Sequence, residues 1–140
     1  LNEALKVGGF FLKHNRQEAK ETFGIDPVTT TARHELKERL KAHGVWGCMV
    51  TDGPRSVWWW EGIDEEILEP LPIHEVSAVG SGDAAMAGLL FARKEKKPFR
   101  EAIRWAMAAG AADAEFPGPC MAQWKDVVRQ LHRILPGADT

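Results

Sequence analysis

Short, continuous apolar runs separated by helical patterns constrain the fold of this sequence more than any other feature. Phe10–Leu12 and Val45–Thr51 are two such runs, and Ser56–Glu61 contains three consecutive tryptophans. Strands that are apolar throughout, rather than alternating, are typical of parallel sheets whose two faces are both covered. The pattern therefore predicts an α/β fold, with a mostly parallel sheet and helices on both of its faces.

Helical patterns fill the intervals between these runs and most of the second half of the chain. Asn15 followed by Glu18 resembles a capping box, and Gly24 would end that helix. The other predicted helices start near Thr29–Thr31, Ala84, Pro98 and Trp124, and end near Gly44, Lys94, Phe116 and Pro136. Residues 1–7 read as the end of a helix without a start, which predicts that a longer chain precedes them.

A glycine turn, Gly80-Ser81-Gly82-Asp83, opens the small-residue helix near Ala84, and a short strand at Val76–Val79 is expected to lead into it. Glycines leave backbone N–H groups uncovered, and the helix start adds a positive dipole end. Such a turn can hold an anion beside the carboxylate of Asp83, which suggests phosphoryl transfer with a general base. The alternative is that Asp83 only caps the helix.

Two further loops follow predicted strands. Asn15 and Glu18 lie beyond the first strand, and Thr51-Asp52-Gly53 lies beyond the second. Ligands of α/β sheets bind beyond the carboxyl ends of strands, so these loops and the glycine turn are expected to converge. Oxygen-bearing side chains suit Mg²⁺. Taken alone, Asn15 and Glu18 also fit a simple capping pair, and Thr51–Gly53 a plain turn.

Together these stretches resemble the ribokinase (PfkB) family of carbohydrate kinases. Ser77–Ala84 is similar to the second family signature, and Lys13–Glu18 is similar to its K-P-N-x-x-E segment. Thr51–Gly53 lies where the family has its T-L-G nucleotide loop, and Met107–Ala114 resembles the nucleotide-side helix of its phosphosugar kinases. The resemblance implies a three-layer ribokinase-like fold. Residues 1–140 would be its C-terminal nucleotide-binding and catalytic portion, without the N-terminal substrate-binding and lid half.

The resemblance also implies a role for each matching residue. The general base would be Asp83, and the anion hole would consist of Gly80, Ser81 and Gly82. The nucleotide would be bound by Thr51, Gly53 and Gly110. Phosphates and Mg²⁺ would be ordered, without direct protein ligands to the metal, by Lys13, Asn15 and Glu18. The sequence departs from the family at His14, Asp52 and Ser56, and Asp52 puts a negative charge near the expected triphosphate.

The function implied is ATP- and Mg²⁺-dependent phosphoryl transfer to a hydroxyl of a sugar or sugar phosphate. The glycine-turn sequence is most similar to the 1-phosphofructokinase and tagatose-6-phosphate kinase branch. Because the acceptor contacts would lie in the earlier half, the 140 residues alone are expected to be inactive. Two alternatives stay open. One is a nucleoside or free-sugar kinase of the same fold, and the other is a non-catalytic α/β module that binds a nucleotide or a partner.

The composition limits the partners and the cellular location expected for this chain. A formal net charge of −2 and a pI near 6.2 argue against a nucleic-acid partner, and no run of ~18 apolar residues predicts a membrane span. Cys48 and Cys120 form no pairing motif, which favours a reducing, cytoplasmic location. Trp58–Trp60 fit core packing or an interface better than a stacking surface. A sheet divided in half exposes an edge and apolar faces, so a homodimer is one expected assembly.

Overall fold

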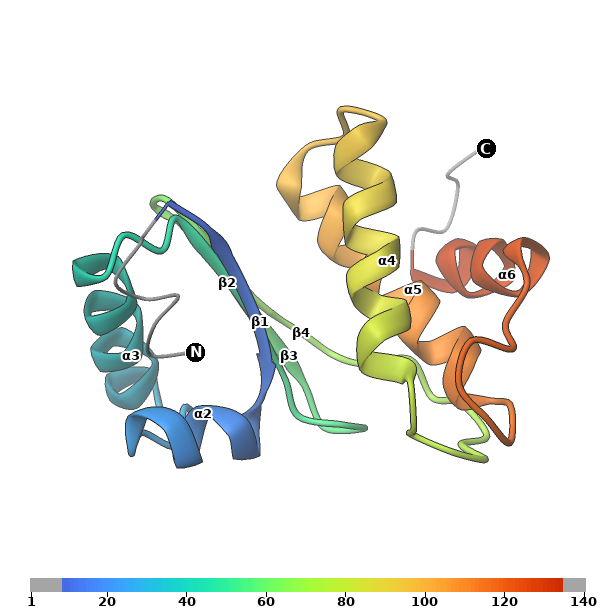
Figure 1. The fold of residues 1–140 in the computed structure, drawn as a ribbon, viewed down its shortest axis with the longest axis horizontal. Helices are drawn as coiled ribbons and strands as arrows, with labels where there is room; N and C mark the ends of the chain where they lie inside the picture. The colour runs from blue at the N-terminus through green and yellow to red at the C-terminus, as the bar shows by residue number, and fades with distance from the viewer. Residues whose placement is uncertain (1–8, 135–140) are drawn as a thin grey trace. The chain divides into compact units, whose positions relative to one another are not determined.

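The computed structural model describes residues 9–134, which divide into two compact units. The first unit extends to Glu69 and contains a four-stranded sheet with two helices. The second begins at Pro70 and contains three helices, α4 (Ser81–Lys94), α5 (Phe99–Ala114) and α6 (Trp124–Ile134) (Figure 1). No helix within residues 9–134 is both long enough and apolar enough to cross a membrane.

The sheet of the first unit has the strand order β1-β2-β3-β4. The strands are β1 (Phe11–Asn15), β2 (Gly47–Thr51), β3 (Val57–Glu61) and β4 (Asp64–Leu68). β1 and β2 are parallel, whereas β2–β3 and β3–β4 are antiparallel. The expected mostly parallel sheet is therefore wrong for these strands. A parallel connection needs a dozen or more residues, and the short turns on either side of β3 allow only hairpins. β2 and β3 are apolar runs because four of their five residues are buried.

Helices α2 (Arg16–Phe23) and α3 (Thr30–Ala42) lie on one side of this sheet (Figure 1). The alternate residues that face them form the core together with side chains of both helices. Trp58 and Trp60 belong to this core, and Trp60 is fully buried. Trp59 is also buried and points to the opposite face, as strand alternation requires. The prediction of core packing is confirmed for Trp58 and Trp60.

The helix ends of the first unit follow the sequence signals closely. Asn15 caps α2 in a complete capping box, and Gly24 ends the helix with φ 68°, in the left-handed region that favours glycine. Thr29 caps α3 by accepting a hydrogen bond from the Ala32 N–H. These ends were predictable because each depends on side chains within three residues of the end.

In the second unit α4 and α5 pack closely through small residues. A Cβ on Gly88 would lie 2.6 Å from the Trp105 carbonyl oxygen and 2.8 Å from Ala109 Cβ. Only glycine allows this approach. The opposite side of α4 is different, because Leu90 is 59% exposed. The helix is therefore apolar but not buried on every side.

The structure differs from the predictions at one expected strand and at the ends of two elements that carry site residues. No strand occurs at Val76–Val79; this segment is irregular and is held by the Ala114 carbonyl, which accepts from Val76 N at 2.8 Å and Ser77 N at 3.1 Å. β1 continues to Asn15 because it pairs with β2 over its whole length. α4 starts at Ser81 rather than Ala84, so Gly82 and Asp83 lie in its first turn. The predictions for residues 1–7 and for Pro136 lie outside the described residues.

Candidate functional site

The glycine turn of the second unit has a backbone that only glycine adopts without strain. Gly80 precedes α4 with φ 89°, and a Cβ there would lie 2.3 Å from Pro119 Cβ. Ser81 closes the turn, since its Oγ donates to the Ala78 carbonyl at 2.8 Å. Asp83 lies in the first helical turn and is exposed. The turn therefore places an exposed carboxylate at the positive end of a 14-residue helix.

Gly110 lies directly behind this turn. A Cβ on Gly110 would lie 3.0 Å from the Ser81 carbonyl oxygen and 3.3 Å from Ala85 Cβ. The glycine thus lets α5 approach the first turn of α4. This explains why a glycine occurs in the middle of a helix, and the predicted nucleotide contact of Gly110 stays a prediction.

In the first unit, Asn15 and Thr51 are aligned partners at the carboxyl ends of the parallel strands β1 and β2. The structure therefore brings these two predicted site residues together. Lys13 lies two residues before Asn15 in β1, on the same face of the sheet. Gly53 lies in the hairpin turn after β2 with φ 54°, a value that again favours glycine.

Asn15 and Glu18 form the capping box of α2. Asn15 Oδ1 accepts from Glu18 N at 2.8 Å, and Glu18 Oε2 accepts from Asn15 N at 2.7 Å. The capping interpretation is thus confirmed, and each side chain uses one oxygen for it. Glu18 keeps a second carboxylate oxygen at an exposed position, which fits contact with a water of a hydrated Mg²⁺. Within residues 9–134, no three His, Cys, Asp or Glu side chains gather as metal ligands.

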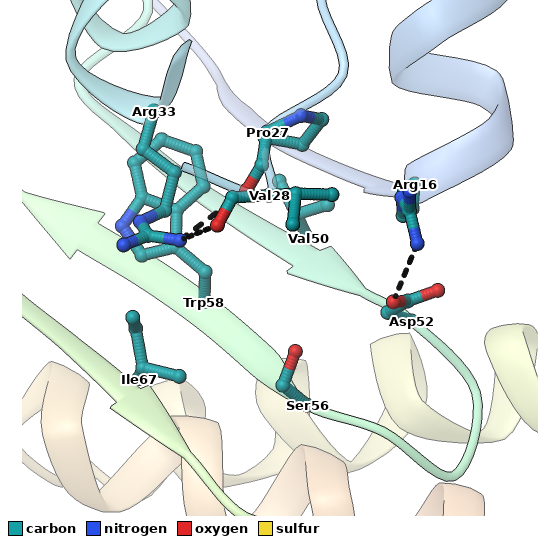
Figure 2. Close-up of a pocket in the computed structure, with 9 residues that line it drawn as sticks. All are labelled: Arg16, Pro27, Val28, Arg33, Val50, Asp52, Ser56, Trp58 and Ile67. Carbon is teal, nitrogen blue, oxygen red and sulfur yellow. Dashed lines mark hydrogen bonds and ion pairs between the residues drawn. The ribbon is translucent and has the colours of Figure 1, made fainter. Parts of the chain in front are cut away.

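Asp52 is neutralised by two arginines, a contact that the sequence pattern did not reveal. Arg55 binds both Asp52 oxygens, and Arg16 Nη1 lies 3.3 Å from Asp52 Oδ2 (Figure 2). Arg16 also binds Asp26 through two hydrogen bonds of 2.6 and 2.8 Å. Arg55 first, and Arg16 with it, holds the pKa of Asp52 below its ordinary value, so the carboxylate is charged at neutral pH. Two positive and two negative charges make this cluster neutral.

A small pocket of about 80 Å³ lies beside this cluster in the first unit. Arg16, Asp52 and Ser56 line its polar part, and Val50 is among the apolar residues of its wall (Figure 2). Ligand sites for small molecules usually measure ~300–1,000 Å³. The pocket is therefore too small for a nucleotide.

His14 is a buried residue of the first unit. Its ring is buried beside Phe23, and its Nε2 lies 3.7 Å from Cys48 Sγ. Burial lowers the pKa of His14 and raises the pKa of the Cys48 thiol, so both groups are neutral at pH 7. His14 is a core residue on the helix-facing side of β1, where its alternation with Lys13 and Asn15 places it.

Asp113 is a further residue that the motifs missed. It is 1% exposed and lies near the end of α5, within the stretch quoted above for its family resemblance. The available signal was a single acidic residue in the small and apolar stretch Met107–Ala114. A carboxylate is almost never buried unless partners compensate it.

Comparison with known proteins identifies the family. Residues 7–125 match the family described as pfkB family carbohydrate kinase. The chain is 24% identical to the 1-phosphofructokinase of Borreliella burgdorferi over 135 residues, which cover 96% of this chain and 43% of that protein. It is 29% identical to the ATP-dependent 6-phosphofructokinase isozyme 2 of Mycobacterium tuberculosis over 129 residues, covering 89% of this chain and 37% of that protein.

Solved structures support the same fold. Phosphofructokinase-2 from Escherichia coli in complex with potassium has a TM-score of 0.82 at 20% identity, covering 93% of this chain and 43% of that one. Ribokinase of Arabidopsis thaliana complexed with ribose and ATP has a TM-score of 0.82 at 24% identity, covering 94% and 43%. The chain thus spans about two fifths of the length of these relatives and has the predicted ribokinase-like α/β fold. It belongs to the pfkB family of carbohydrate kinases.

Proposed function

We propose that this chain is the C-terminal, nucleotide-side portion of an ATP-dependent kinase that phosphorylates a hydroxyl group of a sugar phosphate. The observation that carries the proposal is the Gly80–Asp83 turn. It opens α4 with an exposed carboxylate, in a chain of a carbohydrate kinase family. The acceptor class follows the relatives named phosphofructokinases, and a free sugar or nucleoside is the alternative acceptor.

The proposed chemistry assigns one step to each part of the turn. The acceptor hydroxyl loses its proton to Asp83 while its oxygen bonds to the γ-phosphorus, and the bond to the β–γ bridging oxygen breaks to release ADP. The turn formed by Gly80, Ser81 and Gly82, together with the start of α4, meets the negative charge that develops on the transferred group. These donors are fixed by the fold and need no rearrangement during the reaction.

The nucleotide is proposed to lie over the carboxyl ends of β1 and β2. Thr51 and Gly53 would flank it there, and Lys13 would contact phosphate. A nucleotide contact of Gly110, in the second unit, stays a prediction. Asn15 and Glu18 would hold Mg²⁺ through its waters, and the ion would neutralise phosphate charge. The adjacency of Asn15 and Thr51 supports this placement. A cytoplasmic location and a homodimer stay predictions.

An acceptor panel tests the proposal. We expect the full-length protein that contains this chain to release ADP from ATP and Mg²⁺ with fructose 1-phosphate or fructose 6-phosphate, and much more slowly with ribose or adenosine. The isolated 140 residues should release none with any acceptor. Equal turnover with adenosine would contradict a sugar phosphate as the acceptor class. No turnover with any acceptor would support a non-catalytic binding module instead.

Asp52→Asn should strengthen ATP binding severalfold. The Asp26–Arg16–Asp52–Arg55 cluster is neutral, and the substitution leaves it with one positive charge near the proposed triphosphate site. Calorimetric titration of the full-length protein at low and high salt measures the effect, which should shrink as salt screens it. Asp64→Asn is the control, because it removes the same charge at the other end of the sheet. Weaker binding by Asp52→Asn would show instead that Asp52 orients its arginines for the nucleotide.

A further inference from the structure

The buried carboxylate of Asp113 holds a loop against the glycine turn. It accepts hydrogen bonds from three consecutive backbone N–H groups, those of Cys120 (3.3 Å), Met121 (3.0 Å) and Ala122 (3.4 Å). Cys120 has φ 59°, a conformation that a non-glycine residue adopts only when its surroundings impose it. Asp113 therefore determines the path of this loop.

The same loop contacts Gly80. A Cβ on Gly80 would lie 2.3 Å from Pro119 Cβ and 3.2 Å from Asp113 Oδ2, so the loop and the carboxylate both touch the turn. The next residue of α5, Ala114, accepts from the N–H groups of Val76 and Ser77, which lead into the turn. The last turn of α5 thus holds both the entry to the glycine turn and the loop packed on it.

We propose that Asp113 is a positioning residue for phosphoryl transfer. It fixes the loop Pro119–Ala122 against Gly80 and so sets where the N–H groups of Gly80–Gly82 meet the transferred phosphoryl group. This inference rests on the proposed function, because positioning of the turn affects the reaction only if the turn binds the transferred phosphoryl group. A displacement of about 1 Å in a catalytic group can cost 10²-fold in rate.

Asp113→Asn tests the inference in the full-length protein. The amide keeps the size of the side chain but presents N–H groups where backbone N–H groups now donate. We expect kcat per folded enzyme to fall about 10- to 100-fold, with the KM for the acceptor little changed. Asp126→Asn is the matched control. Asp126 is also buried and accepts from a backbone N–H, that of Gln123 at 3.0 Å, but its interactions are with Gln123 and Arg129, outside the loop that touches Gly80.

Measuring Asp83→Asn together with Asp113→Asn and Asp126→Asn gives three outcomes that decide whether Asp113 is a positioning residue. A loss of kcat in Asp113→Asn but not in Asp126→Asn supports positioning. Normal kcat in Asp113→Asn, measured below its own unfolding temperature, overturns the inference while the loss in Asp83→Asn keeps the proposed function. Normal kcat in Asp83→Asn overturns both.

Pro119→Gly covers the case in which Asp113→Asn does not fold. It removes the Pro119 ring, whose Cβ is the atom nearest to the Cβ position of Gly80, and it leaves the carboxylate of Asp113 unchanged. Positioning predicts a lower kcat for this variant too, and unchanged turnover would refute it.

Discussion

Asp83→Asn is expected to lower kcat of the full-length protein by about 10²–10⁴-fold, the usual contribution of a general base. The amide cannot take the proton of the acceptor hydroxyl, yet it matches the carboxylate in size. Asp83 is exposed, so its only structural contribution is its charge at the start of α4, worth about 0.3–1 kcal/mol. The unfolding temperature and the affinity for ATP should therefore change little.

Steady-state assays measure the expected loss of kcat, and thermal unfolding of the same preparation measures the expected constancy of the unfolding temperature. Glu101→Gln is the control, because Glu101 is an acidic residue in the first turn of α5, as Asp83 is in α4, although it also pairs with Lys97 at 2.9 Å. Both variants lose one charge at a helix start, and only Asp83→Asn should lose turnover. Unchanged turnover in Asp83→Asn would reduce Asp83 to a helix cap.

Gly80→Ala is expected to lower the free energy of unfolding by about 2–5 kcal/mol. A non-glycine residue pays about 1–2 kcal/mol in the left-handed region, and an overpacked side chain adds about 1–3 kcal/mol. Both costs apply, since Gly80 has φ 89° and its Cβ would lie 2.3 Å from Pro119 Cβ. Displacement of the turn should also reduce turnover.

Gly62→Ala separates the two costs. Gly62 has φ 58°, but a Cβ there would have no atom within 4 Å, so only the conformational cost of about 1–2 kcal/mol is expected. Urea unfolding followed by circular dichroism compares the variants. Equal losses at Gly80 and Gly62 would mean that the loop at Pro119 moves away freely. That result would also weaken the positioning inference for Asp113.

Local features of this chain were predictable and long-range contacts were not. The Asn15–Glu18 capping box and the glycine end of α2 depend on residues within one helical turn, so the sequence predicts them directly. The adjacency of Asn15 and Thr51 also followed, because neighbouring parallel strands end at the same edge. Strand direction failed, since a buried antiparallel strand is as apolar as a parallel one. Only the shortness of the turns beside β3 distinguished the two cases.

One of the two ion pairs of Asp52 connects residues far apart in the chain, whereas the other, with Arg55, is local. Arg16 reaches Asp52 across 36 positions, and no periodicity or local motif encodes that contact. Asp113 meets Gly80 only because α5 packs behind the turn. A single acidic residue in an apolar helix indicated that some partner must exist, but it did not indicate which one.

The close seam between α4 and α5 has a consequence for mutagenesis surveys. Gly88 has no room for a side chain, and it lies about one and a half helical turns after Asp83 on the helix that carries the proposed base. Any larger residue there is expected to push α4 away from α5 and to move the start of α4, the proposed anion-binding end, with it. A survey that scores positions by lost turnover would therefore rank Gly88 with the catalytic machinery, although it contacts no reactant. Comparing soluble yield with turnover for each variant separates such scaffold positions from chemical ones.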